Sequence, residues 1–283
     1  MAKDTHYNKH DVLLLEQQIK DLREEAKTKD EFIRITNHEL RTPLDIIRGN
    51  LDMVLKGEAG EISASTREYL VDALFGADRL TGLVDDMLDI ARITTGQMRF
   101  ELTEINICEL LETVEKEFSP IAKEKRLVLY KDCFKDVPLV YSDKSRLFQI
   151  FDNLIGNAFK FTPRGGSVTI RVVDDHANVP DTILVSVIDT GSGIKKEDIS
   201  KLFKQFPDIE KRILPTEKGT GLGLNLVWHV LKALGGEIWA ESDGFGKGTT
   251  FFFRLPIAGS ERGKQLYNYH AVYLKSGSDA RKE

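Results

Sequence analysis

Cysteine is scarce in this sequence of 283 residues, and long hydrophobic runs are missing from it. The two cysteines, Cys108 and Cys133, lack the spacing of a zinc site and are too few for a disulfide framework. We therefore expect both to be small buried apolar side chains in a reducing compartment. No stretch of about 18 apolar residues occurs and no signal peptide opens the chain, which predicts a soluble, cytoplasmic segment without membrane contact. This expectation leaves room for a longer natural chain that is anchored in a membrane upstream of Met1.

An excess of charge of one sign is also missing. The 40 basic residues are balanced by 45 acidic ones, so the net charge of −5 gives no basic field that would attract nucleic acid. Hydrophobic residues make up 41 % of the chain and charged residues 30 %, which is typical of a globular protein rather than a disordered one. The length suits two modest domains.

Glycine and proline are rare between residues 12 and 56, which predicts a long helix. Apolar residues recur along its first part in steps of four and three, the pattern of a coiled-coil seam. The seam consists of Leu15, Ile19, Leu22, Ala26 and Ile33. A loop with two glycines follows at 56–63, and a second amphipathic helix reaches Ile90. We expect an antiparallel helical hairpin, and two hairpins of a homodimer would close a four-helix bundle.

The pattern changes after residue 98. Helical segments are predicted at 106–124, 143–160 and 221–234, and strands at 126–130, 166–173 and 182–189. Because the strands and helices do not alternate regularly, we expect an α/β sandwich with helices on one face of a mixed sheet. Residues 259–283 are polar and lack a clear period, so we interpret them as a tail or linker.

The first helix contains the stretch "ITNHELRTPLDII" at residues 35–47. Extending the seam places His38 at the position farthest from the bundle core, so its imidazole should be accessible and nucleophilic near neutral pH. Glu39 can accept a ring proton and orient the imidazole, and Thr42 lies one turn later on the same face. Pro43 cannot donate to the carbonyl of Glu39, which predicts a bend after the histidine. The alternative is an exposed histidine with no task.

A second stretch, "FDNLIGNAFKFT" at 151–162, places Asn153 and Asn157 on one helix face, with Lys160 near them. An amide oxygen can bind Mg²⁺, which keeps waters and phosphate oxygens as its other ligands, and an ammonium can offset phosphate charge. Alternatively, these amides only cap or hydrogen-bond a neighbouring loop.

Two glycine-rich stretches complete the set. In "DTGSGI" (189–194), Asp189 ends a predicted strand and could accept a hydrogen bond from an exocyclic amine such as that of adenine. A simple turn would explain the same residues. In "KGTGLGL" (218–224), glycines expose backbone N–H groups at a helix N-terminus, where phosphate can bind. The charged stretch 207–218 between them suits a mobile lid.

Together these motifs resemble those of the sensor histidine kinases of two-component systems. "HELRTPL" (38–44) resembles the phosphoacceptor box, "NLIGNAFKFT" the N box, "DTGSGI" and "GTGLGL" the two glycine boxes and "LFKQF" (202–206) the F box. All occur in the family's order within residues 30–257. The resemblance implies a coiled-coil linker (1–30), a dimerisation and histidine-phosphotransfer hairpin (31–98) and a catalytic domain (99–258) of the type shared with gyrase, mismatch-repair and chaperone ATPases.

The resemblance also implies roles for single residues. His38 would accept the γ-phosphoryl group of ATP, Glu39 would be its general base, and Thr42 would act in dephosphorylating the response regulator. Asn157 would bind Mg²⁺. The implied ATP-binding residues are Asn153, Asn157, Lys160, Asp189, Gly191, Gly193, Gly219, Gly221, Leu222 and Gly223.

The implied activity is ATP-dependent autophosphorylation of His38 and transfer of the phosphoryl group to an aspartate of a response regulator. Two other functions stay open: an ATPase of the related fold, which would not need His38 on a dimerising hairpin, and a nucleotide-binding scaffold without turnover. The sequence departs from the family at Lys204 and Gln205 in the F box and at Asn225, which stands where the family has a small residue and which the sequence leaves unexplained.

Overall fold

The computed structural model describes residues 14, 17, 18, 28, 35, 36, 39–134, 136–175, 179–204 and 221–279, with side chains described as far as residue 270. The chain divides into two compact units, Met1–Gln97 and Met98–Glu283, and each is described by itself. Most of the predicted coiled coil and His38 lie outside the described residues. None of the helices in the described part is long and apolar enough to span a membrane.

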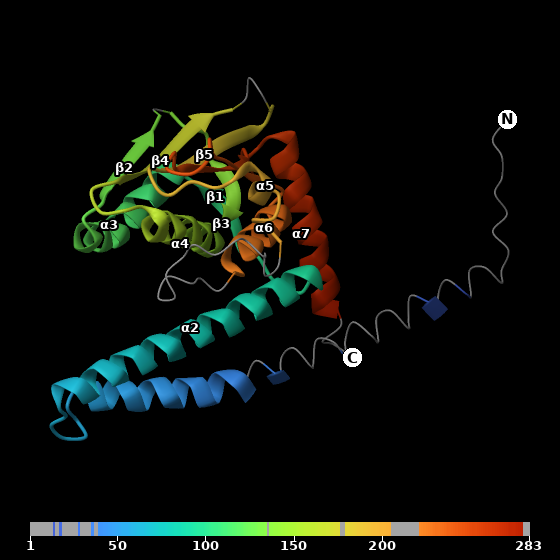
Figure 1. The fold of residues 1–283 in the computed structure, drawn as a ribbon. Coiled ribbons are helices and arrows are strands. Elements are labelled where there is room, and N and C mark those ends of the chain that lie inside the picture. The colour runs from blue at the N-terminus through green and yellow to red at the C-terminus, as the bar shows by residue number, and fades with distance from the viewer. Residues whose placement is uncertain are drawn as a thin grey trace, which may run out of the picture. The chain divides into compact units, whose positions relative to one another are not determined.

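The first unit contains the predicted helical hairpin. Its first helix runs over residues 39–55 without interruption at Pro43, a turn follows, and α2 spans Ala64–Thr94 (Figure 1). Ser63 caps α2 by accepting a hydrogen bond from the backbone N–H of Thr66 at 3.1 Å. The hairpin confirms the fold expected for this part of the sequence.

Apolar and ionic contacts hold the two hairpin helices together. The buried apolar side chains are Leu44, Ala77, Leu88 and Ile90. Arg41 pairs with Asp85 across the hairpin at 3.7 Å, and Arg48 approaches Asp78 at 3.9 Å. Because all four charged side chains are about half exposed, these ion pairs orient the helices more than they stabilise them.

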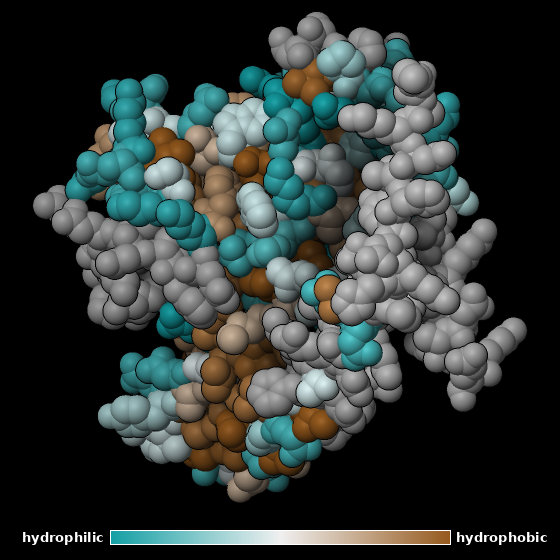
Figure 2. Space-filling view, turned by 90° about the vertical axis from the view of Figure 1, so that its right-hand side faces the viewer, coloured by the Kyte–Doolittle hydropathy of each residue, from teal (hydrophilic) through white to brown (hydrophobic). Residues whose placement is uncertain are grey.

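The hairpin also exposes many large apolar side chains. They are Leu40, Ile46, Ile47, Met53, Tyr69, Val71, Phe75, Leu80 and Met87. Figure 2 shows hydrophobic residues gathered on the hairpin, in the lower part of the view. An apolar surface of this extent is typical of an interface with another protein chain.

The second unit is an α/β sandwich. Its main sheet has the order β2-β4-β5-β7-β6, in which β2 and β4 are parallel and the other neighbours antiparallel. These strands span Val128–Cys133 (β2), Ser167–Asp174 (β4), Thr182–Asp189 (β5), Thr249–Pro256 (β7) and Glu237–Glu241 (β6). A separate two-stranded sheet pairs β1 (Leu102–Ile105) with β3 (Val140–Asp143).

Three long helices cover one face of the main sheet (Figure 1). They are α3 (Ile107–Lys125), α4 (Lys144–Phe161) and α6 (Gly223–Ala233), and the short α5 spans Lys196–Ile199. The core forms where the apolar faces of the helices meet the sheet, as where Phe151 of α4 packs edge-on to Phe253 of β7 at 5.7 Å between ring centroids. This layer arrangement confirms the fold class predicted from the sequence.

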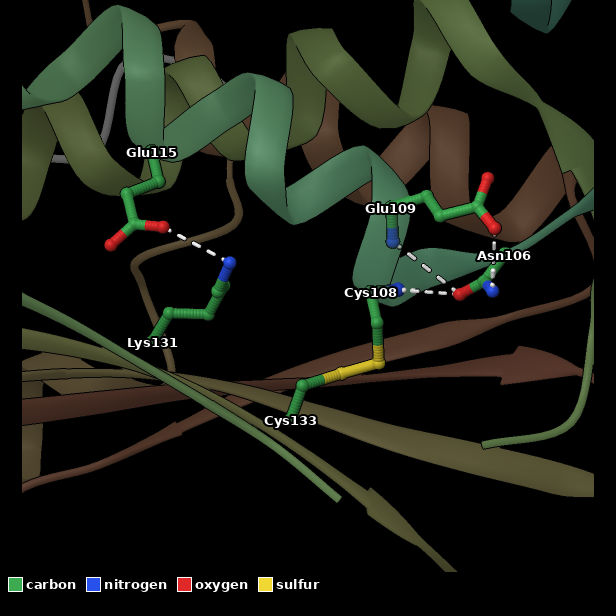
Figure 3. Close-up of a disulfide and its surroundings, with 6 residues drawn as sticks. All are labelled: Asn106, Cys108, Glu109, Glu115, Lys131 and Cys133. Carbon is green, nitrogen blue, oxygen red and sulfur yellow. Dashed lines mark hydrogen bonds and ion pairs between the residues drawn. A yellow bond between two sulfur atoms is a disulfide. The ribbon is translucent and has the colours of Figure 1, made fainter. Parts of the chain in front are cut away.

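The two cysteines form a disulfide, so the prediction that they would be separate apolar side chains was wrong (Figure 3). Cys108 lies in the first turn of α3 and Cys133 is the last residue of β2. The helix α3 packs on β2, and alternate residues of β2 face it. Lys131 of β2 accordingly pairs with Glu115 of α3 at 3.0 Å. The same packing brings the Cα atoms of the two cysteines to 6.0 Å from each other. A spacing in the sequence could not reveal this distance.

The segment interpreted as a tail contains a long helix, α7 (Glu261–Asp279). Ser260 caps it by accepting a hydrogen bond from the N–H of Gly263 at 3.0 Å. Leu266 is buried, and the ring of Tyr267 packs edge-on to Tyr141 of β3 at 5.6 Å. The sequence did not reveal this helix because its residues are mostly polar and show no clear period.

Candidate nucleotide site

The face of α4 opposite the core presents the polar residues that the sequence singled out. Asn153, Asn157 and Lys160 are partly exposed, whereas the residues between them that face the sheet are buried. The amide nitrogen of Asn153 donates to the carbonyl of Gln149, one turn earlier, at 3.0 Å. This hydrogen bond fixes the amide, so its Oδ1 atom is directed away from its own helix.

The start of α6 lies directly against Asn153. A β-carbon added to Gly223 would collide with Oδ1 of Asn153, so a larger residue at the first position of this helix would force the Asn153 side chain to move. Gly221 has φ +74°, a conformation that favours glycine, and Leu222 between the two is fully buried. The N-cap residue Leu222 makes no side-chain hydrogen bond to the helix, and the backbone N–H groups of a first helical turn are a common site for an anion. Gly219 lies outside the described residues.

Asp189 is the last residue of β5 and is only 6 % exposed. Its Oδ1 atom accepts hydrogen bonds from the N–H of Gly191 at 2.7 Å and of Thr249 at 3.2 Å. Burial raises the pKa of the Asp189 carboxyl, and the two backbone hydrogen bonds oppose this shift. Within the described part of the chain no hydrogen bond involves Oδ2, which leaves that oxygen to accept from a ligand.

The first glycine box packs against the end of α4. The N–H of Ser192 donates to the carbonyl of Phe161, the last residue of α4, at 3.0 Å. A β-carbon on Gly191 would lie 2.6 Å from that carbonyl, and one on Gly193, which has φ +66°, would collide with the carbonyl of Gly244. The fold therefore places "DTGSGI" against the end of α4. The same helix contacts the start of α6 through Asn153.

A loop before β7 supports Asp189, and sequence reasoning missed it. Gly248, with φ +72°, packs so closely on the backbone of Asp189 that a β-carbon there would collide with its carbonyl. The hydroxyl of Ser242 donates to the carbonyl of Gly248 at 2.7 Å and accepts from the N–H of Ile194 at 3.0 Å. The glycines in "SDGFGKG" were the only available signal, and they did not indicate a partner.

The structure describes some of the remaining predicted residues and leaves others outside the described ranges. The ammonium of Lys160 lies over the ring of Phe161, 4.8 Å from its centroid. Glu39 and Thr42 are exposed on the first hairpin helix. Residues 205–220, with part of the F box and the predicted lid, lie outside the described residues, as does His38.

Comparison with known proteins identifies both units. The family described as histidine kinase-, DNA gyrase B- and HSP90-like ATPases matches residues 142–259. The His Kinase A (phospho-acceptor) domain matches residues 28–96. The chain belongs to the sensor histidine kinases, with a phosphoacceptor hairpin followed by an ATPase-type α/β domain.

Individual relatives support this assignment. The "Non-motile and phage-resistance protein" of Caulobacter vibrioides is 35 % identical over 237 residues, covering 83 % of this chain and 28 % of that protein. The sensor histidine kinase WalK of Bacillus subtilis is 32 % identical over 241 residues, covering 84 % of this chain and 39 % of that protein. The crystal structure of full-length ShkA in complex with AMPPNP is 31 % identical, with a TM-score of 0.65 over 81 % of this chain and 47 % of ShkA. The chain thus spans less than half of each of these proteins.

Proposed function

We propose that this member of the sensor histidine kinases phosphorylates itself on His38 with ATP and passes the phosphoryl group to an aspartate of a response regulator. The observation that carries the proposal is the convergence of three distant segments, the polar face of α4, the Asp189 turn and the uncapped start of α6, on one region of the second unit. Together they offer an acceptor for a base, amides and an ammonium for phosphates, and the backbone N–H groups of a helix N-terminus.

The adenine would be recognised by Asp189. Its Oδ1 atom is held by the backbone of Gly191 and Thr249, which leaves Oδ2 to accept from an exocyclic amino group. Burial makes this hydrogen bond selective, because a base without a donor would leave a nearly inaccessible carboxylate unsatisfied. The close backbone packing at Gly191 and Gly193 fixes the turn that carries Asp189.

The triphosphate would lie between α4 and the start of α6, where Lys160 offsets its charge and the N–H groups near Gly223 bind its oxygens. The donors fit a magnesium ion, since Asn157 supplies an amide oxygen and Oδ1 of Asn153 is held in place by the hydrogen bond to Gln149. When bound, Mg²⁺ would neutralise phosphate charge and align the γ-phosphate. That AMPPNP binds full-length ShkA supports a nucleotide in the same fold.

The hairpin would supply the acceptor. The exposed position of Glu39 next to His38 suits a base that takes the imidazole proton while the γ-phosphoryl group is transferred. The exposed apolar residues of the hairpin support a homodimer, in which two hairpins bury these surfaces in a four-helix bundle. The exposure of Thr42 one turn from His38 also favours a phosphatase activity on the phosphorylated response regulator.

Incubation of the full chain with γ-labelled ATP and Mg²⁺ tests the kinase. We expect a protein-bound label that is labile in acid and stable in alkali, and that is lost in His38→Ala and Asn157→Ala. His229→Ala serves as the control, because this histidine, whose ring packs on its neighbour Trp228, is not among the proposed site residues. Free phosphate release that survives His38→Ala without any label would show an ATPase. Nucleotide binding without label or release would show a scaffold.

A further inference from the structure

Asn225 is a buried polar residue in the first turn of α6, with 7 % of its surface exposed. Its side-chain amide nitrogen donates to the backbone carbonyl of Phe203 at 2.7 Å. A carbonyl oxygen can only accept a hydrogen bond, so the amide nitrogen, not its oxygen, must face Phe203. The bond joins two segments that are 22 residues apart in the chain.

Each end of this hydrogen bond is attached to a different part of the domain. On one side, Leu202 is buried and the ring of Phe203 packs edge-on to Phe251 of β7 at 6.5 Å, so the turn after α5 is fixed to the sheet. On the other side, Asn225 lies two residues after Gly223, whose α-carbon abuts Asn153. Asn225 therefore links the turn at Phe203 to the start of α6.

We propose that Asn225 is a positioning residue for the nucleotide, which holds the first turn of α6 at a fixed place between the Phe203 turn and Asn153. It would act without touching the ligand. This inference rests on the proposed function, because it assumes that the start of α6 binds the phosphates of ATP.

The local structure gives the reason why one side chain has this effect. Because the N-cap residue Leu222 has no side-chain hydrogen bond to α6, the position of the first turn depends on tertiary contacts such as that of Asn225. Without the Asn225 amide, the Phe203 carbonyl would lose this donor. The first turn of α6 would then have to become ordered when the nucleotide binds, which weakens binding. A small residue at position 225 could not donate to the Phe203 carbonyl, because it has no side-chain amide.

The test compares the full chain with Asn225→Ala and Asn225→Asp, using calorimetric titration with Mg-ATP and autophosphorylation at increasing ATP. The aspartate keeps the shape of the side chain but cannot donate when ionised, so it serves if the alanine variant does not fold. We expect both variants to bind Mg-ATP roughly tenfold more weakly and to raise KM, with kcat at saturation nearly unchanged.

Asn106→Ala is the matched control. Asn106 caps α3 by accepting from the N–H groups of Cys108 and Glu109, so its loss should lower the melting temperature without changing ATP affinity. If the Asn225 variants behave like this control, the residue is structural only and the inference is overturned. If the unchanged chain itself fails to bind Mg-ATP, the proposed function fails first and the inference falls with it.

Discussion

Oδ1 of Asn153 on α4 occupies the space where a β-carbon of residue 223 would stand, so the amide of one helix and the first glycine of another are in direct contact. Asn153 cannot easily yield, because its amide nitrogen is bonded to the carbonyl of Gln149. The contact fixes the distance between the N box and the second glycine box, the two elements proposed to hold the triphosphate.

Gly223→Ala should therefore weaken nucleotide binding. The new methyl group would force Asn153 to rotate and give up its hydrogen bond, and we expect a loss of roughly tenfold or more in Mg-ATP affinity, measured by calorimetry. Gly76→Ala in α2 is the control, since a β-carbon there meets nothing within 4 Å. Equal affinities of the Gly223 variant and the unchanged chain would contradict the proposed phosphate site.

Asp189→Asn should separate binding from stability. Burial raises the pKa of Asp189 in the folded state. At pH values between the unfolded and the folded pKa, the folded state therefore binds more protons than the unfolded chain. The free energy of unfolding consequently falls as the pH rises through this window. Asparagine removes the charge, so the variant should unfold at the same or a higher temperature at pH 7 and lose this part of the pH dependence, while adenine nucleotides bind far more weakly.

Thermal unfolding from pH 3 to 8 with and without ATP measures both effects of Asp189→Asn. A variant that is destabilised more at pH 7 than at pH 3 would show that the charge of Asp189 stabilises the fold, contrary to the raised pKa of this carboxyl.

The Cys108–Cys133 disulfide closes a loop with a sequence separation of 25 residues. Under oxidising conditions, Cys108→Ser should lower the free energy of unfolding by about 2–4 kcal/mol, because the unfolded chain regains freedom. A reducing agent should destabilise the unchanged chain by a similar amount and leave the variant unaffected. Denaturant titrations with and without dithiothreitol give the comparison, and insensitivity of the unchanged chain to reductant would refute it.

Phe75→Glu should disrupt the predicted homodimer. The side chain is 61 % exposed on the hairpin, and burying a carboxylate in a four-helix bundle would cost several kcal/mol. Sedimentation velocity should show a dimer for the unchanged chain and a monomer for the variant. Glu58→Lys, in the exposed turn of the hairpin, changes charge without touching the apolar surface and should remain dimeric.

Periodicity was enough to predict the two helices of the hairpin, because an exposed amphipathic helix repeats its apolar residues with the turn of the backbone. The same logic failed for α7, whose described contacts come from separate residues: Leu266 is buried, Tyr267 packs on Tyr141, and His270 packs on Phe100 at 5.2 Å. Such contacts leave no regular apolar stripe in the sequence.

The sequence by itself determined which chemistry we propose for this protein, because the histidine box, the paired asparagines and the glycine boxes are local patterns whose residue types limit what they can bind. Only the tertiary structure decided which residues support them. Thr249 donates to Asp189 from 60 residues away, and Asn225 reaches Phe203 across 22. Such partners meet because strands and helices from distant parts of the chain pack together. Their distance along the chain follows no fixed spacing, so the sequence alone does not reveal them.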